Sequence, residues 1–402
     1  MSYLNFELIQ GDSLEELKKL KDNLFQTCVT SPPYWALRNY FEDRQIGQEQ
    51  TLEDYIENIV NVCFEVKRVL RDDGTFWLNL GSTYCGTGHK KDTKDKLGGM
   101  PKARNGQSFA LNYKVEGFKP KDLIPIPWII AQALQKPILK CDNCDYEGHY
   151  IKWGILPDYQ KWCPHCKSVV SYKVIEQGWY LRIDNIWRKN NPVPAPVQDR
   201  PTMGHEYLFL FSKSKKYFYD HYAIMEEAQS SNKKSRRIGA KNQKGTNRKD
   251  QGRFFAGGEK RNKRSVWDAS VSRYKGSHFS TFPESLINPC ILAGSSTYGC
   301  CIKCNSPWKR TLKREEVLIE GSDKYITNFK SKGWEPTCSC NTTEVKPCLV
   351  LDPFNGAATT GLVSLKNESN YVGIDINQSY LDLSKDRLID LDPIFIKEDK
   401  LV

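Results

Sequence analysis

The stretch that decides the fold is Leu349-Val350-Leu351-Asp352-Pro353-Phe354-Asn355-Gly356-Ala357-Ala358-Thr359-Thr360-Gly361. An apolar run is followed by a tight turn of small residues and by residues that can begin a helix. The next apolar run ends in Asp375, 19 positions after Gly356. This spacing is typical of a nucleotide-binding βαβ unit, in which small residues let a ligand approach the backbone and the acid accepts hydrogen bonds from ribose. The alternative is an ordinary tight turn with a solvated aspartate.

The rest of the chain repeats the alternation of strand and helix. Further apolar runs of strand length occur at 6–10, 25–29, 75–80, 182–187 and 207–212. Helical periodicity occurs at 14–20, 52–71 and 127–135, from about Thr359, and after Asp375. We expect Asp72-Asp73-Gly74 to end the second helix before the strand at 75–80 begins. The fold class predicted is α/β, a Rossmann-like sheet with helices on both faces.

A second turn, Thr30-Ser31-Pro32-Pro33-Tyr34-Trp35, directly follows the strand expected at 25–29. Its two prolines force an extended, non-helical turn. Taken alone, this could be a turn packed by Tyr34 and Trp35. Together with the Asp352 turn, it resembles the amino-methylating DNA methyltransferases, in the Ser-Pro-Pro-Tyr form typical of cytosine-N4 enzymes. The order of the two motifs resembles the β-type arrangement of that family.

The resemblance implies a mechanism for this turn. An exocyclic amine is a poor nucleophile because its lone pair is delocalised into the ring. Acceptors for both of its N–H groups favour a pyramidal nitrogen, and the Ser31 hydroxyl and the Pro32 carbonyl are the acceptors expected. Tyr34 would stack on the target base after the base is flipped out of the duplex. The catalytic set predicted is Ser31, Pro32, Pro33 and Tyr34.

The resemblance also implies a site for S-adenosylmethionine. The residues expected to bind it are Asp12, Ser13, Phe279, Ser280, Thr281, Pro283, Asp352, Pro353, Phe354, Gly356, Thr359, Thr360 and Asp375. The sequence departs from the family motif at Ala358, where a second glycine is usual. Alanine fits there if φ stays negative, because its Cβ disfavours the left-handed region. We do not include His205 and Glu206 in the catalytic set, because they are interpreted as part of a turn that leads into a buried strand.

The 14 cysteines predict metal sites rather than disulfides. The first set, Cys141, Cys144, Cys163 and Cys166, has the spacing of a four-thiolate zinc site. A second set with less regular spacing is also interpreted as a zinc site: Cys301, Cys304, Cys338 and Cys340. In the second set Cys300 could substitute for Cys301. The other five cysteines (Cys28, Cys63, Cys85, Cys290 and Cys348) are interpreted as small apolar residues. A catalytic thiol is not expected, because methylation of an amine needs no covalent adduct with the base.

Charge is concentrated in one segment. Residues 230–264 hold thirteen basic and two acidic residues, so this segment alone accounts for the net charge of +11. Either it is a solvated loop, or it contacts a polyanion. We favour double-stranded DNA, because the segment lies between the catalytic and cofactor motifs, where the family that the chain resembles keeps its target-recognition region. With no apolar stretch of membrane-spanning length and no signal peptide pattern, we expect a cytoplasmic protein with no membrane partner. A restriction endonuclease that acts on the same site is a further expected partner.

These observations predict how the chain is divided. The segments are 1–135 (catalytic half), 136–181 (first zinc insert), 182–222 (return to the sheet), 223–265 (basic DNA-contacting segment), 266–297 (cofactor-contacting segment), 298–345 (second cysteine insert) and 346–402 (cofactor-binding half). The function predicted is cytosine-N4 methylation of DNA. Adenine-N6 methylation in the same fold is the alternative. A zinc-dependent nucleic-acid-binding protein with an inactive methyltransferase fold is the alternative from another class.

Overall fold

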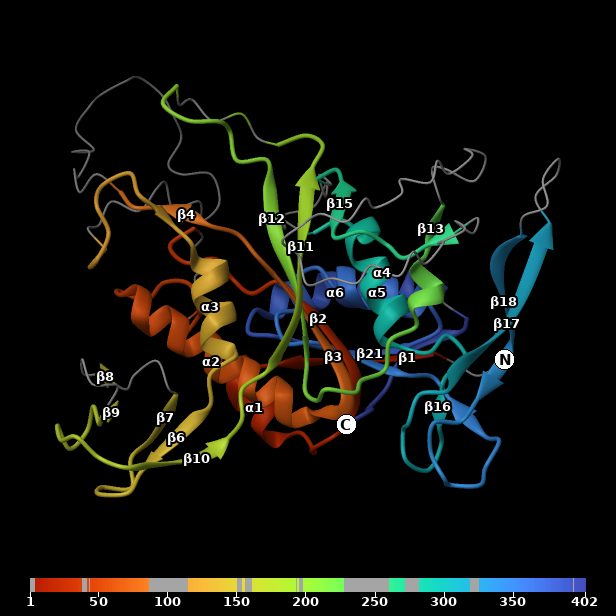
Figure 1. Cartoon of the computed structure of the whole chain (residues 1–402), viewed down its shortest axis with the longest axis horizontal. Helices are drawn as coiled ribbons and strands as arrows, with labels where there is room; N and C mark the ends of the chain where they lie inside the picture. Colours follow the sequence, from red (N-terminus) through yellow and green to blue (C-terminus); the bar gives the residue numbers. More distant parts are fainter. Residues whose placement is uncertain are drawn as a thin grey trace, which may run out of the picture.

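A computed structural model describes residues 4–37, 42, 44–86, 115–149, 154–155, 161–192, 194, 198–227, 260–271, 282–318, 325–392 and 394–402. Its centre is a nine-stranded sheet (Figure 1). In spatial order the strands are β15 (Val266–Ala269), β11 (Tyr180–Lys189), β12 (His205–Ser212), β3 (Leu70–Leu80), β2 (Phe25–Thr30), β20 (Leu349–Asp352), β21 (Asn370–Asp375), β1 (Leu4–Gln10) and β22 (Ile396–Glu398). Strand β12 runs antiparallel to both of its neighbours, and every other pairing in this sheet is parallel.

Helices cover both faces of the sheet, so the predicted α/β class is confirmed (Figure 1). One face packs against α1 (Ser13–Lys19), α2 (Leu52–Val69) and α3 (Ile126–Leu134). The other packs against α4 (Glu284–Gly294), α5 (Thr359–Lys366) and α6 (Gln378–Ile389). The alternation of strand side chains divides the two cores: Phe76 and Leu78 belong to the first core, and Trp77 belongs to the second.

The boundary between α2 and β3 differs from the prediction. The helix ends at Val69 and the strand begins at Leu70, so Asp72-Asp73-Gly74 lie within the strand instead of before it. Leu70 is completely buried and pairs with Phe25 of β2, and the register shifts before Thr27 pairs with Thr75. Burial of Leu70 against the neighbouring strand therefore overrides the turn signal of the two aspartates and the glycine.

The first cysteine insert packs against α2. It contains a three-stranded sheet of β6 (Ile138–Cys141), β7 (Glu147–His149) and β10 (Tyr172–Glu176), and the pair β8 (Gly154–Ile155) and β9 (Lys161–Trp162). His149 Nε2 lies 3.0 Å from Asn61 Oδ1, and its ring lies 4.6 Å from that of Phe64. The Lys67 ammonium donates to Glu176 at 3.0 Å. These contacts join the insert to a helix of the central domain.

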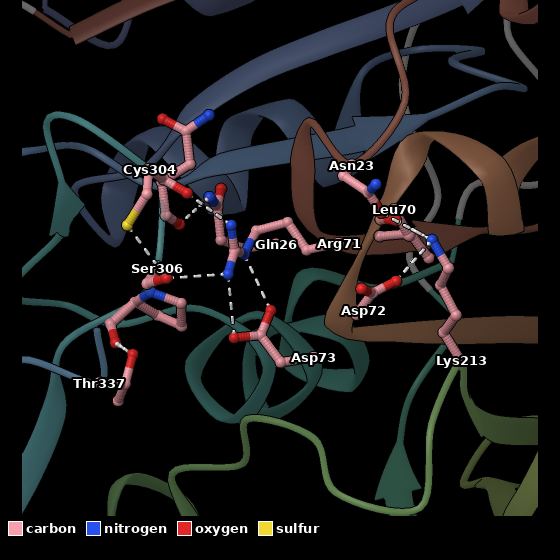
Figure 2. Close-up of polar contacts among 12 residues, drawn as sticks. Asn23, Gln26, Leu70, Arg71, Asp72, Asp73, Lys213, Cys304, Ser306 and Thr337 are labelled. Carbon is pink, nitrogen blue, oxygen red and sulfur yellow. Dashed lines mark hydrogen bonds and ion pairs between the residues drawn. The ribbon is translucent and has the colours of Figure 1, made fainter. Parts of the chain in front are cut away.

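The second cysteine insert is attached to strands β2 and β3 of the sheet. It contains β16 (Cys300–Cys301) paired with β19 (Val345–Lys346), and a long hairpin of β17 (Lys309–Leu318) and β18 (Tyr325–Glu335). Figure 2 shows Arg71 between this insert and the sheet: its guanidinium donates to the Cys304 carbonyl at 2.6 Å, to Ser306 at 3.0 Å and to Asp73 at 2.8 Å. The Gln26 amide of β2 donates to the Asn305 carbonyl at 2.8 Å.

Five short elements complete the described structure. They are the pair β4 (Thr83–Tyr84) and β5 (Leu123–Ile124), the 3-10 helix η3 (His221–Ile224), and the pair β13 (Glu226–Glu227) and β14 (Lys260–Arg261). Within the described residues, no helix combines the length and the apolar character that a membrane crossing requires.

Candidate active site

A cavity of about 310 Å³ opens where the parallel strands of the sheet end. Chain segments at the ends of β1, β2, β20 and β21 reach it, and β12 begins at the same edge because it runs in the opposite direction. The carboxyl edge of a parallel sheet is where ligands bind in open α/β folds. Twelve of the predicted site residues line the cavity: Asp12, Ser13, Ser31, Pro32, Pro33, Tyr34, Asp352, Pro353, Phe354, Gly356, Thr359 and Asp375.

The other predicted site residues lie elsewhere. Thr360 is completely buried behind the turn, where its hydroxyl donates to Asp352 at 2.8 Å and contacts the Val29 carbonyl at 3.1 Å. Pro283 precedes α4, and its neighbour Phe282 lines the cavity. Phe279, Ser280 and Thr281 lie outside the described residues.

The Asp352 carboxylate holds the turn between β20 and α5. It accepts hydrogen bonds from the Thr30 hydroxyl at 2.6 Å, from Thr360 and from the Phe354 amide at 3.0 Å. Burial raises its pKa to about 6, against the lowering effect of these three donors. Because Thr30 directly precedes Ser31, this carboxylate links the two motifs that the sequence singled out.

The Asp375 carboxylate, at the end of β21, contacts the middle of the same turn. Its two oxygens accept from the Gly356 amide at 2.7 Å and from the Asn377 amide at 2.9 Å. Burial raises the pKa of this group to about 6 as well. A carboxylate has about four acceptor positions, so it can still accept hydrogen bonds from a ligand in the cavity.

The expectation that Ala358 keeps a negative φ is wrong. This residue has φ 51° and ψ 41°, in the left-handed region. Its amide donates to the Asn355 carbonyl at 2.9 Å, its carbonyl accepts from the Leu362 amide at 2.9 Å, and its side chain is completely buried. The left-handed conformation costs alanine roughly 1–2 kcal/mol, which these hydrogen bonds and the buried methyl group offset.

The Ser31–Tyr34 turn places its tyrosine in the cavity. The Tyr34 hydroxyl donates to Glu206 Oε2 at 2.6 Å and lies 3.4 Å from Asn79 Oδ1. Burial, and next the charge of Glu206, raise the pKa of Tyr34 well above its usual range. The Pro33 carbonyl accepts from the Tyr55 hydroxyl at 2.9 Å, which fixes the turn on α2.

Several polar and aromatic residues that line the cavity are not among the predicted site residues, and they include Asn79, Trp187, Lys189 and Glu206. Glu206 is not in the predicted catalytic set, yet its side chain lines the cavity and is ion-paired with Lys189. The signal in the sequence is a charged residue two positions before the buried run of β12. Recognising it requires knowing that β12 runs antiparallel, which brings its first residues to the carboxyl edge.

Both predicted cysteine sets are brought together. Within each set the sulfurs lie within 4.8 Å of one another, with 3.7 Å between Cys144 and Cys163 and 3.9 Å between Cys141 and Cys166. Four thiolates at 2.3 Å from a tetrahedral zinc ion would be about 3.8 Å apart. The second set contains Cys301, while the Cys300 thiol donates to the Pro347 carbonyl at 3.6 Å. The five cysteines interpreted as apolar residues are all buried.

Comparison with known proteins finds a family model, curated relatives and solved structures that are similar to this chain. A family model described as DNA methylase matches residues 25–301 and 342–386. The Type II methyltransferase M.SmaI of Serratia marcescens is 32% identical over 387 residues, which cover 95% of this chain and 90% of that protein. M.Cfr9I of Citrobacter freundii is 32% identical over 383 residues, covering 95% and 87%. Among solved structures, the PvuII DNA methyltransferase (cytosine-N4-specific) aligns with 99% of this chain and 96% of its own, at 13% identity and a TM-score of 0.49.

Proposed function

The chain belongs to the N6/N4 DNA methylase family, and from this membership we propose that it transfers a methyl group from S-adenosylmethionine to the N4 amine of cytosine in double-stranded DNA. The observation that carries the proposal is that the Ser31–Tyr34 turn and the turn between Asp352 and Thr359 line one cavity, although more than 300 residues separate them. The serine at the head of the first turn favours cytosine over adenine.

The residues at the Asp375 end of the cavity fit the cofactor. Gly356 and Ala357 leave the backbone of the turn accessible, Asp375 can accept from ribose hydroxyls, and the aromatic rings of Phe354 and Tyr380 can contact adenine. When bound, S-adenosylmethionine supplies an electrophilic methyl group. Asp352 does not need to touch it, since its hydrogen bonds to Thr30 and Phe354 set the geometry of both turns.

The residues of the Ser31 turn act on the target base. The Ser31 hydroxyl and the Pro32 carbonyl accept hydrogen bonds from the amine and orient its lone pair toward the cofactor end of the cavity. Tyr34 stacks on the flipped base. The prolines keep these groups preorganised, so little reorganisation accompanies the transfer.

The basic segment is proposed to bind the DNA backbone. The part of it that the structure describes is anchored: Arg261 and Arg264 donate to Glu226 at 2.9 and 2.6 Å, and the Lys263 ammonium lies 5.1 Å from the Trp267 ring centroid. The other basic residues between 230 and 259 lie outside the described residues. Their density of positive charge suits contacts with phosphates, which set affinity rather than sequence specificity.

Each cysteine set is proposed to hold one zinc ion. In each set four cysteine sulfurs lie within 4.8 Å of one another, and four thiolates are a donor set that structural zinc prefers. The first insert has only a small core of its own, so metal binding would supply part of its folding free energy.

Nucleoside mass spectrometry of DNA incubated with the protein and S-adenosylmethionine tests the proposed reaction. We expect N4-methylcytosine. N6-methyladenine without N4-methylcytosine would establish the adenine alternative, and absence of any methylated base would leave the zinc-dependent nucleic-acid-binding alternative. A restriction endonuclease acting on the same site is also proposed, and resistance of methylated DNA to that endonuclease would identify it.

A further inference from the structure

An ion pair of unassigned role forms the end of the cavity opposite the cofactor residues. Lys189 is the last residue of β11 and Glu206 is the second residue of β12, and the two strands pair beside each other. The Lys189 ammonium donates to Glu206 Oε1, and Glu206 Oε2 accepts from Tyr34. The side chains are largely buried, with exposed fractions of 22% and 12%.

We propose that Lys189, positioned by Glu206, donates a hydrogen bond to the O2 carbonyl of the flipped cytosine and thereby determines the choice of base. This inference rests on the proposed cytosine-N4 function and assigns a specificity-determining residue to it. Glu206 acts as a positioning residue, because it orients the ammonium and the Tyr34 hydroxyl with its two oxygens.

The arrangement of the sheet supports this assignment. From Ser31 at the end of β2, the strand order continues through β3 and β12 to β11. Three strand spacings, about 14 Å, separate Ser31 from Lys189 across the sheet, and Lys189 also lies four residues, about 13 Å, further along its strand than Asn185, which is level with Ser31. The backbones are thus roughly 19 Å apart, and with the serine and lysine side chains entering from the two ends, the remaining gap suits a single base held with its amine at Ser31 and Pro32.

The chemistry of the two candidate bases supports it as well. When the amine of cytosine is held at Ser31, the far end of its Watson–Crick edge presents O2, an acceptor. Adenine presents a C–H group at the corresponding position. An ammonium has three N–H donors, and its bond with Glu206 uses one. A buried donor that finds no acceptor is costly, so this lysine would reject adenine.

A neighbouring aromatic residue restricts the lysine further. Its ammonium lies 5.0 Å from the ring centroid of Trp187, whose own indole N–H donates to the Ala269 carbonyl at 2.9 Å. Both Trp187 and Lys189 line the cavity. The ammonium is therefore confined by an acid on one side and an aromatic face on the other, the preorganisation that a specificity contact needs.

The test combines a protein substitution with a substitution of one atom in the base. The methylated site is first mapped by sequencing a plasmid treated with the full chain. Duplexes are then made with deoxycytidine or 2-thiodeoxycytidine at the target position, since sulfur is a poor acceptor. Single-turnover methylation is measured for the unchanged protein, Lys189→Met, Glu206→Gln and Lys213→Met.

Lys213→Met is the matched control. Lys213 follows the other end of β12, its exposed fraction is 19%, and it is ion-paired with Asp72 at 3.1 Å on the edge of the sheet away from the cavity (Figure 2). Affinity for S-adenosylmethionine is measured on every variant as a check of folding, because no part of the proposed contact involves the cofactor.

We expect the sulfur substitution to slow the unchanged protein and Lys213→Met by about 10- to 100-fold, the range of a charge-assisted hydrogen bond. Lys189→Met should methylate both duplexes slowly and at the same rate. In Glu206→Gln the sulfur should lower the methylation rate by a smaller factor than in the unchanged protein. Equal sensitivity of Lys189→Met and the unchanged protein to the sulfur would overturn the proposal. If Lys189→Met fails to bind the cofactor, Glu206→Gln provides the test: slowing by the sulfur as large as in the unchanged protein would overturn the proposal. A product methylated on adenine refutes the cytosine function itself, which is a separate result.

Discussion

At the scale of single residues, the proposed chemistry depends on how Tyr34 is held. Its ring lies beside Gly81, where a Cβ atom would approach Tyr34 Cε2 to 2.8 Å. Its hydroxyl bonds to Glu206, and the preceding proline carbonyl bonds to Tyr55. The glycine leaves space for the ring, and the polar contacts fix its orientation.

The first prediction concerns this glycine. Gly81→Ala should displace the Tyr34 ring, because a contact of 2.8 Å between carbon atoms cannot persist. We expect kcat/KM for methylation to fall by about tenfold or more, in line with a loss of base stacking of about 1–3 kcal/mol. Affinity for S-adenosylmethionine, measured by calorimetry, should stay unchanged. Unchanged methylation would show that the position of the ring is unimportant.

The second prediction concerns pH and Asp375. The folded pKa of about 6 lies above the roughly 3.9 of an unfolded aspartate, so the folded chain binds more protons between these values. This group therefore makes the fold less stable as pH rises from about 4 to 6. Cofactor affinity should follow the opposite course, because only the ionised carboxylate accepts two ribose hydrogen bonds, and it should fall as pH drops through about 6.

Calorimetric titration of S-adenosylmethionine between pH 5 and 8 measures this effect. Asp352 also has a pKa of about 6, so both carboxyl groups can contribute to the pH dependence of cofactor affinity. The contribution of Asp375 is the pH dependence that is lost in Asp375→Asn. An identical pH profile in Asp375→Asn and the unchanged protein would refute the role given to this carboxylate.

Much of the residue-level site could be predicted from sequence, because Ser31, Asp352 and Asp375 each follow a strand that the apolar pattern identifies. Ala358 could not, since its left-handed backbone is imposed by the closure of the turn and by burial of its methyl group. Lys189 and Glu206 could not either. Both side chains reach the cavity because β11 pairs with β12 and β12 pairs with β3, and local sequence does not encode the register of these pairs.

At the scale of elements, the two cysteine inserts are attached to different parts of the domain. The first is joined to α2 by Lys67 and His149. The second is joined to the amino ends of the strands by Gln26 and Arg71, and Gln26 also accepts from the Leu349 amide at 2.5 Å. The boundaries given to the inserts, 136–181 and 298–345, stay predictions.

The third prediction follows from this difference. Cys304→Ser should lower zinc content from about two ions per chain to about one, and should lower the melting temperature. The substitution should also weaken cofactor binding. The loop that contains Cys304 contacts β2 and β3, and β2 is the neighbour of β20, which ends in Asp352. Cys163→Ser should cause the same loss of zinc with cofactor affinity retained.

Metal analysis, thermal unfolding and calorimetry of the two variants provide the comparison. Equal cofactor affinity in both variants would contradict a link between the second insert and the cofactor site. Full zinc content in either variant would contradict the ligand assignment for that set.

At the scale of the whole molecule, charge and catalysis are separated along the chain. The segment at 230–264 carries the net charge, while the cavity is built from residues outside it. The sheet order, with its single antiparallel strand β12, gathers residues from both ends of the chain at one edge. DNA binding and base chemistry should therefore be separable by mutation.

The fourth prediction tests this separation. Replacing Lys233, Lys241, Lys244 and Lys249 by alanine should reduce the slope of log affinity for DNA against log salt by about 0.9 for each phosphate that the segment no longer neutralises. Single-turnover methylation at saturating DNA should stay near that of the unchanged protein. A slope that does not change would identify the segment as a solvated loop.

The most direct test of the central claim is mass spectrometry of nucleosides from DNA treated with S-adenosylmethionine and either the unchanged protein or Tyr34→Ala. We expect N4-methylcytosine with the unchanged protein, and a rate of formation that is lower by about 5- to 150-fold with Tyr34→Ala, the range of the lost base stacking. N4-methylcytosine formed at an equal rate by both proteins would contradict the assignment of the Ser31–Tyr34 turn as the catalytic site.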